Sequence, residues 1–242
     1  MTVLLLAGTG EAVRIAGACH VKGIPTIASL AGATRNPAAL SVPTRHGGFG
    51  GDAGFEAFLS AEKITTVMDA THPYAHRISQ RTARICAQRG IPYCQFLRPP
   101  WTPEPQDRWT ELASEAEAAE HIEPGACVFL ATGRQTLDKF AGLSECRLIC
   151  RQIDPPEGPF PFPNGRFLVG RPPFTVQDEA ELFAKLGVDW LVVKNAGGAA
   201  SFTKLIAARL LGLRVAMIAR PAQPSGPKVQ TIDDAVNWIM AQ

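Results

Sequence analysis

Polar turns that follow short apolar runs carry the residues whose types could do chemistry. The segment 69–74, DATHPY in one-letter code, brings an acid, a hydroxyl, an imidazole and a phenol together. Groups of these types can orient an aromatic ring, hydrogen-bond a carboxylate or donate a proton. We therefore predict a site here, with His72 and Tyr74 as candidate catalytic residues and Thr71 as a candidate cofactor-binding residue.

A glycine turn, GTGE at residues 8–11, follows the first apolar run and precedes a helical pattern. Glycines let the backbone approach an anion, and a helix N-terminus adds unpaired N–H groups and positive potential. Because Val13 stands where GxGxxG would have its third glycine, a plain strand–helix connection fits equally well. The candidate phosphate-binding residues are Gly8, Thr9, Gly10 and Glu11.

The end of the second apolar run bears on which nucleotide would bind. NAD-binding domains usually place Asp or Glu there to hold the ribose hydroxyls. This chain instead has Ser29, followed by small residues and Arg35, which suits a 2′-phosphate. The residues favour NADPH over NADH, although Arg35 also fits an ordinary surface arginine.

A loop with four glycines in five positions, GGFGG at residues 47–51, precedes the next helical pattern. Such a loop can wrap closely around a cofactor or act as a mobile lid. Ordering so free a backbone costs conformational entropy, which favours a functional over a purely structural loop. The candidate cofactor-binding residues are Gly48, Phe49 and Gly50.

Two later turns, TGR at 132–134 and KNAGG at 194–198, combine cationic side chains with open backbone. The chain has 24 Lys+Arg against 22 Asp+Glu, a net charge of +2. A local cationic cluster on such a chain indicates an acidic ligand rather than a nucleic acid, although each basic residue alone also fits an ordinary surface charge. The candidate substrate-binding residues are Arg134, Lys194, Gly197, Gly198, Lys204 and Arg220, and Lys194 is also a candidate catalytic residue.

Short apolar runs alternate with helical patterns, which predicts an α/β protein with mainly parallel sheets. The second half repeats the first, since residues 67–99 and 192–221 both run strand, polar turn, helix, glycine, strand, Arg-Pro. We predict two similar Rossmann-like domains facing each other across a cleft: an NADPH-binding domain at 1–105 and a domain contributing to the substrate site at 106–242. The turns described above then fall at the carboxyl ends of the strands, where ligands bind in open α/β sheets.

Composition excludes several classes of protein. A hydrophobic fraction of 46% over 242 residues rules out wholesale disorder, and no apolar run approaches the ~20 residues of a membrane-spanning helix. The N-terminus lacks the basic region of a signal peptide. The six cysteines contain no CxxC pair, so we expect buried thiols, no metal site and a cytoplasmic protein. The GxSxG, Walker A, HExxH and YxxxK motifs are absent.

The ordered set GTGE, SLAG, GGFGG, DATHPYA, TGR, RPPF, VVKNAGG and ARP spans essentially the whole chain. In this the chain resembles the precorrin-6A reductase family of cobalamin biosynthesis. Where several members have arginine directly after SLAG, this chain has Ala33, with Arg35 two positions on. Where members often have serine in KNSGG, it has Ala196.

The resemblance implies reduction of one double bond of a polycarboxylate tetrapyrrole, precorrin-6A, by NADPH to give precorrin-6B. It also implies cofactor phosphates at residues 9–11, a 2′-phosphate near Ser29 and Arg35, and the nicotinamide by the GGFGG loop and the DATHPYA turn. The macrocycle would then lie between the domains.

Three alternatives stay open: a reductase or epimerase with a small substrate, an NADPH or tetrapyrrole carrier without turnover, and a methyltransferase. The residues also leave open whether the substrate contains cobalt and whether the protein is a monomer.

Overall fold

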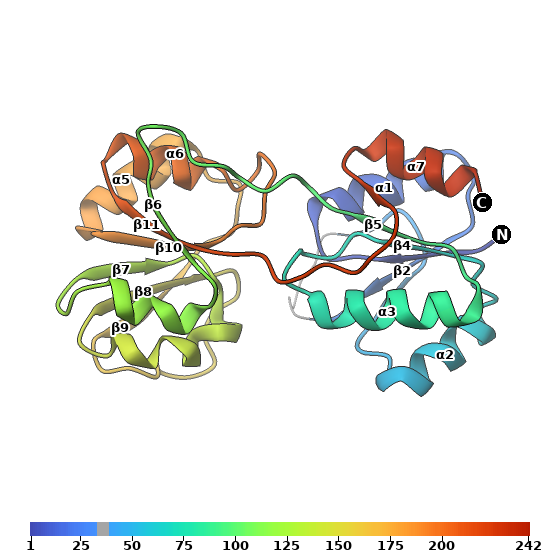
Figure 1. The fold of residues 1–242 in the computed structure, drawn as a ribbon, viewed down its shortest axis with the longest axis horizontal. Coiled ribbons are helices and arrows are strands. Elements are labelled where there is room, and N and C mark those ends of the chain that lie inside the picture. Colours follow the sequence, from blue (N-terminus) through green and yellow to red (C-terminus); the bar gives the residue numbers. More distant parts are fainter. Residues whose placement is uncertain (33–38) are drawn as a thin grey trace. The chain divides into compact units, whose positions relative to one another are not determined.

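The computed structural model describes residues 1–32 and 39–242, which form two compact units (Figure 1). Unit 1 comprises Met1–Pro99 together with Pro221–Gln242, and unit 2 comprises Pro100–Arg220. Each unit is built on a six-stranded sheet in which every described pairing is parallel. The predicted α/β class and the two similar parallel-sheet domains are confirmed.

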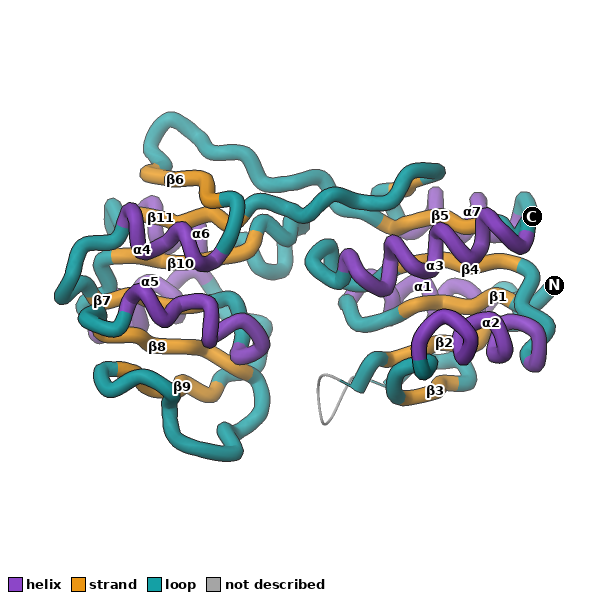
Figure 2. Tube along the Cα trace, turned by 60° about the horizontal axis from the view of Figure 1, so that its bottom comes forward, coloured by secondary structure: helices purple, strands orange, loops and turns teal. Residues whose placement is uncertain are grey.

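The sheet of unit 1 has the strand order β12-β5-β4-β1-β2-β3 (Figure 2). Its elements are β1 (Val3–Leu6), α1 (Gly10–Val21), β2 (Thr26–Leu30), β3 (Thr44–His46), α2 (Gly51–Ala61), β4 (Thr66–Asp69), α3 (His76–Arg89), β5 (Tyr93–Phe96), β12 (Lys228–Val229) and α7 (Ile232–Met240).

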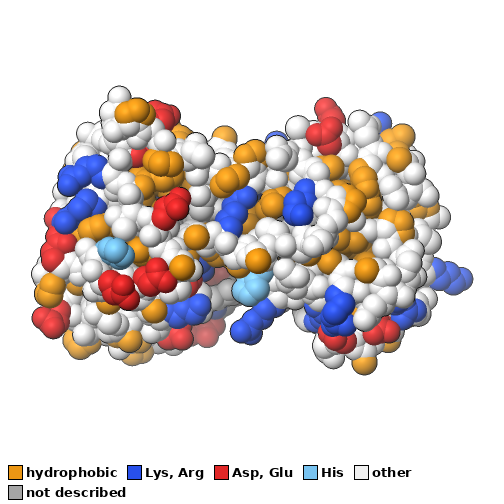
Figure 3. All heavy atoms as spheres, in the orientation of Figure 1, with side chains coloured by type: hydrophobic (Ala, Val, Ile, Leu, Met, Phe, Trp, Pro, Cys, Tyr) orange, Lys and Arg blue, Asp and Glu red, His pale blue; other side chains and the backbone are white. Residues whose placement is uncertain are grey.

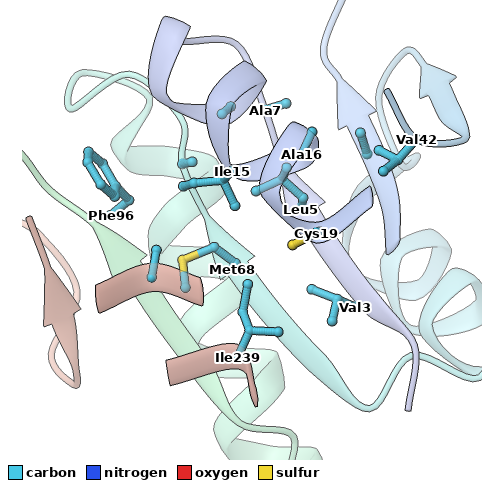
Figure 4. Packing of buried hydrophobic residues seen from close by; sticks show 14 of the residues in the cluster. Val3, Leu5, Ala7, Ile15, Ala16, Cys19, Val42, Met68, Phe96 and Ile239 are labelled. Atoms are coloured by element: carbon cyan, nitrogen blue, oxygen red, sulfur yellow. The ribbon is translucent and has the colours of Figure 1, made fainter. Parts of the chain in front are cut away.

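Alternation along β1 explains how helices cover both faces of this sheet. Successive side chains of a strand point to opposite faces, and all four residues of β1 are buried. Val3 and Leu5 pack in a cluster with α1 and α7, and Figure 4 shows them with Ile15, Cys19 and Ile239. The intervening leucines of β1 pack in a second cluster with α2 and α3.

The sheet of unit 2 has the order β6-β11-β10-β7-β8-β9. Its buried cluster joins the sheet to α5 and α6, while η2 packs against β8. The elements are β6 (Arg108–Leu112), η1 (Glu115–Glu117), α4 (Ala118–His121), β7 (Cys127–Leu130), η2 (Arg134–Leu143), β8 (Arg147–Gln152), β9 (Gly165–Val169), α5 (Val176–Leu186), β10 (Trp190–Lys194), α6 (Thr203–Leu210) and β11 (Arg214–Ile218).

The two sheets have the same strand order, but the strand at one edge of each sheet comes from the chain that leaves the other sheet. The chain leaves β5 of unit 1 and forms β6 beside β11 of unit 2, then leaves β11 and forms β12 beside β5. The predicted boundary at 105/106 therefore needs correction, because residues 221–242 belong to unit 1. Pairing of β12 with β5 and packing of α7 against α1 hold them there.

Four short strands, β3, β6, β9 and β12, were not predicted from the sequence. None has the continuous buried run of a central strand: their residues are TRH, RWTEL, GRFLV and KV, and nearly all are half-buried or exposed. The segment after the TGR turn forms η2, a 3₁₀ segment that Thr136 and Phe140 interrupt with non-helical backbone. All six cysteines are unpaired and buried, as expected. Within the described part of the chain, no helix has the length and apolarity to cross a bilayer.

Candidate functional site

The turn after β1 is tied to the turn after β4 through one hydroxyl. Thr9 caps α1, its Oγ1 accepting a hydrogen bond from the Ala12 N–H (3.2 Å), and donates to the Ala70 carbonyl (2.8 Å). Gly8 has φ +136°, a conformation that L side chains rarely adopt, and no atom lies within 4 Å of where a Cβ would be. The predicted phosphate turn therefore has a fixed backbone with open space beside it.

Glu11 in the same turn forms a partly buried ion pair. Its carboxylate lies 2.9 Å from Nη1 of Arg98, at the end of unit 1's fifth strand, and 3.5 Å from Nη2 of Arg14. Both Glu11 and Arg98 side chains are less than one-fifth exposed. Glu11 thus joins the first turn of α1 to the chain that follows β5, a role that the sequence did not indicate.

A buried carboxylate organises the DATHPYA turn. Asp69 is fully buried at the end of β4. It accepts hydrogen bonds from the Thr71 N–H (3.0 Å), the Thr71 hydroxyl (2.7 Å) and the Tyr93 hydroxyl (2.8 Å). Burial, with the adjacent Asp69 charge, raises the pKa of Tyr93, so this phenol stays protonated and donates. The Thr71 hydroxyl, predicted to contact cofactor, bonds to Asp69.

His72 and Tyr74, the candidate catalytic residues of this turn, are half-buried and close together. Their ring centroids are 5.6 Å apart, and His72 Nδ1 accepts a hydrogen bond from the Tyr74 N–H (3.3 Å). An accepting Nδ1 puts the proton of a neutral imidazole on Nε2. The turn therefore holds an imidazole and a phenol side by side, the side-chain types that the sequence predicted.

The GGFGG loop is anchored by its aromatic residue. Phe49 packs edge-on against Phe55 (4.8 Å between centroids) and Phe58 (5.2 Å) of α2. A Cβ on Gly54 would lie 1.8 Å from the Phe49 carbonyl oxygen, so only glycine at 54 lets the loop approach the helix. The Phe49 ring therefore packs against α2, whereas Gly48 and Gly50 on either side of it are exposed.

At the carboxyl ends of β2 and β3, Ser29 and Arg45 meet. Nη1 of Arg45 donates to Ser29 Oγ at 2.8 Å, and Ser29 is buried. The sequence did not indicate Arg45, because the three residues of β3 are too few to predict a strand. Without that strand, nothing shows that Arg45 is the register partner of Ser29. Arg35, the predicted partner of Ser29, lies outside the described residues.

In unit 2, the cation at the end of β10 faces a carboxylate. Lys194 Nζ lies 3.3 Å from both Glu115 Oε1 and Thr136 Oγ1. Burial opposes ionisation of Glu115, but a hydrogen bond from its own backbone N–H and the charges of Lys194 and Lys139 outweigh it and lower its pKa. The structure therefore brings Lys194 together with an acid that the sequence analysis did not single out.

The KNAGG turn is held from both sides. Asn195 exchanges two hydrogen bonds with the Trp101 backbone (2.8 and 2.9 Å), and the Trp101 indole donates to the Gly198 carbonyl (2.9 Å). Nε of Arg220 donates to the Asn195 carbonyl (2.6 Å). Gly197 and Gly198 both have positive φ. Arg220, predicted to bind substrate, supports this turn.

Unit 2 also contains a buried charge cluster of Arg151, Glu179 and Lys204. Arg151 and Glu179 form a two-pronged ion pair with both N–O distances at 2.7 Å. Lys204 is also buried and donates to the Ser201 carbonyl (2.8 Å). Burial and the Arg151 charge, partly offset by Glu179, lower the pKa of Lys204 to about 8. Lys204 was predicted to contact substrate and lies among these groups.

A pocket of about 470 Å³ opens beside the TGR turn. Arg134 and Asp138 line it, with apolar walls from Leu137 and Phe167. Gln152, at the end of β8, also lines it; the residue is buried, and among the described residues neither its amide nitrogen nor its amide oxygen has a hydrogen-bond partner. Buried amides normally have partners, so Gln152 marks this pocket as a place for a polar ligand.

The distribution of charge agrees with a small ligand. On the face shown in Figure 3, acidic and basic side chains are interspersed over both units rather than gathered into one basic surface. Among the residues that the structure describes, no cluster of three or more His, Cys, Asp or Glu side chains is arranged to hold a metal ion.

Known proteins match the chain over its whole length. A sequence model of the precorrin-6x reductase CbiJ/CobK family matches residues 2–240. The precorrin-6A reductase of Rhodobacter capsulatus is 43% identical over 98% of this chain and 95% of its own, and that of Rhodococcus erythropolis is 41% identical over 98% and 96%. A solved structure described as CobK precorrin-6A reductase superposes with a TM-score of 0.95 at 43% identity, covering 100% of this chain and 97% of its own. The chain belongs to the precorrin-6x reductase CbiJ/CobK family.

Proposed function

We propose that this protein reduces one double bond of precorrin-6A with NADPH, giving precorrin-6B in cobalamin biosynthesis. The observation that carries the proposal is the set of relatives named precorrin-6A reductase, which are 38–43% identical over 98% of this chain. Relatives named cobalt-precorrin-6A reductase are 24–28% identical, which favours the metal-free substrate. Six unpaired thiols favour a cytoplasmic location.

Unit 1 is assigned to the cofactor. The residues after β1 fit a phosphate-bearing nucleotide, because Gly8 leaves open space beside the first N–H groups of α1. The end of β2 has Ser29 where NAD-binding domains place an acid. The cofactor-binding residues are Gly8, Thr9, Gly10, Glu11, Ser29, Gly48, Phe49, Gly50 and Thr71, with Arg35; Thr9, Glu11, Phe49 and Thr71 act by fixing the turns.

A bound nicotinamide supplies the hydride, and the protein must hold the acceptor and provide a proton. His72 is the leading proton donor in this assignment. Its half-buried ring stands on a turn that Asp69 fixes, and it would donate the proton from the imidazolium form. Tyr74 lies beside it as the alternative donor. Lys194, beside Glu115, is assigned to holding charge on the substrate rather than to releasing a proton.

Unit 2 is assigned to the carboxylates of the macrocycle. Arg134 lines the pocket and offers a guanidinium, the group best matched to a carboxylate. Gly197 and Gly198 present backbone in the turn after β10. Lys204 and Arg220 contribute by supporting that turn, through the Ser201 and Asn195 carbonyls.

The test is consumption of NADPH by the purified protein with precorrin-6A, with NADH and with the cobalt-containing substrate in parallel arms. Substrate-dependent loss that is fastest with NADPH and metal-free precorrin-6A is expected. Loss confined to the cobalt substrate would move the protein to the other branch. Tight NADPH binding without any loss would support a carrier and contradict the proposal.

A further inference from the structure

The place where Arg45 meets Ser29 has the features of a recognition site for a phosphate monoester. In the parallel pairing of β2 with β3, Ser29 is the register partner of Arg45. Both residues stand near the carboxyl ends of their strands, the edge of an open α/β sheet at which ligands bind. The guanidinium thus lies at the position from which dinucleotide-binding domains contact the 2′ position of the adenosine ribose.

The guanidinium is held in one orientation. Nη1 donates to Ser29 Oγ (2.8 Å) and to the Gly47 carbonyl (2.9 Å), and Nη2 donates to the Gly48 carbonyl (2.9 Å). Its carbon lies 4.1 Å from the ring centroid of Phe49 and 5.2 Å from that of Phe58. Because these contacts fix the side chain, little conformational entropy is left to lose when a ligand binds.

Among the described residues, two N–H donors of Arg45 have no acceptor and its positive charge has no acidic partner. An arginine has five N–H donors, and the described residues accept from three of them on Arg45. The donors without a described partner, on Nε and Nη2, belong to one edge of the guanidinium, the fork that binds two oxygens of a phosphate. Every described partner of Arg45 is neutral, and none is a carboxylate.

We propose that Arg45 binds the 2′-phosphate of NADPH and that Ser29 positions it, so that this pair sets the preference for NADPH over NADH. The inference rests on the proposed function and deepens its cofactor site. Ser29 is only 6% exposed, and its Oγ accepts from Arg45, which makes it a positioning residue. The ribose-binding carboxylate of NAD-specific domains is replaced here by an arginine on the neighbouring strand.

Binding and kinetics of Arg45→Gln test the assignment. Calorimetry with 2′,5′-ADP and 5′-AMP needs no turnover, so it separates this inference from the reductase itself. We expect wild type to bind 2′,5′-ADP more tightly than 5′-AMP, and Arg45→Gln to weaken 2′,5′-ADP by about 10- to 100-fold while changing 5′-AMP by less than twofold. In the reductase assay, KM should rise for NADPH and stay level for NADH.

Two further variants complete the design. Arg45→Lys keeps the charge but loses the fork, and Ser29→Ala frees the guanidinium, so both should fall between wild type and Arg45→Gln. The control is Arg84→Gln, which removes an exposed arginine paired with Asp52 and should leave both ligands unaffected. Equal weakening of 2′,5′-ADP and 5′-AMP in Arg45→Gln would show that Arg45 only supports the loop. Unchanged 2′,5′-ADP binding would overturn the proposal.

Discussion

Corresponding strands of the two sheets end in polar residues, and these residues differ in how their hydrogen-bonding groups are paired. Near the end of β2, Ser29 is bonded to Arg45 of the neighbouring strand, whereas at the end of β8 the amide of Gln152 has no hydrogen-bond partner among the described residues. After β4, Asp69 accepts three hydrogen bonds from its own surroundings. The turns that carry Ser29 and Asp69 are therefore preformed and internally bonded. Gln152 instead keeps a buried amide on the wall of a pocket, where a polar ligand could bond to it.

The largest expected effect concerns the buried ion pair of unit 2. Glu179→Gln leaves Arg151 beside Lys204 without a compensating charge, and breaking one partner of a buried pair costs about 3–5 kcal/mol. Urea denaturation of the variant measures this loss. Glu181→Gln, on the exposed side of the same helix, should change stability by less than about 0.5 kcal/mol. A loss below about 1 kcal/mol for Glu179→Gln would show that the cluster is not tightly coupled.

The matching experiment in unit 1 removes the carboxylate of the DATHPYA turn. Asp69→Ala removes the acceptor of three hydrogen bonds, one of them from the buried Tyr93 hydroxyl, and we expect a loss of about 3 kcal/mol. Turnover should fall as well at temperatures where the variant is fully folded, because His72 loses its fixed position. The exposed Asp233→Asn serves as the control. Full turnover in folded Asp69→Ala would separate this carboxylate from the chemistry.

The pH dependence of stability reports on Lys204. Its pKa is about 8 in the folded protein against an ordinary value of 10.5, so between these pH values the folded state binds fewer protons than the unfolded chain. Raising the pH through this interval therefore increases the contribution of Lys204 to the free energy of unfolding, by about 3 kcal/mol. We expect wild type to gain stability relative to Lys204→Met between pH 8 and 10.5. For the exposed Lys185→Met, the difference in free energy of unfolding from wild type should not change with pH. A difference that stays constant with pH for Lys204→Met would contradict a lowered pKa of Lys204.

The smallest expected effect is a gain in stability, in contrast to the losses expected for Glu179→Gln and Asp69→Ala. Gln152→Met removes an unpartnered buried amide, so we expect the free energy of unfolding to rise by about 1 kcal/mol. At the same time KM for precorrin-6A should increase, because the pocket loses its polar group. The exposed Gln106→Met is the control for stability. A loss of stability would mean that Gln152 has a structural partner and that the pocket carries no ligand.

The sequence predicted most of the central strands, because buried parallel strands are continuous apolar runs. It also located the turns after β1, β4, β7 and β10, since a strand, a polar turn and a helix recur in both halves. The edge strands escaped prediction because β3 and β12 have only three and two residues, and because most side chains of β6 and β9 are half-buried or exposed. Pairs such as Ser29 with Arg45, or Glu11 with Arg98, depend on strand order, which a single sequence does not specify.

The exchange of sixth strands has a consequence for folding during synthesis. Domains usually fold in the order in which they emerge from the ribosome. Here unit 2 is one continuous stretch, Pro100–Arg220, whereas unit 1 waits for β12 and α7 at residues 228–240. Until they emerge, the edge of β5 and the apolar face that packs against α7 stay exposed, and an open strand edge invites pairing with other chains. Unit 2 can therefore finish folding before unit 1. During synthesis it is unit 1 whose open strand edge must be kept from pairing with other chains.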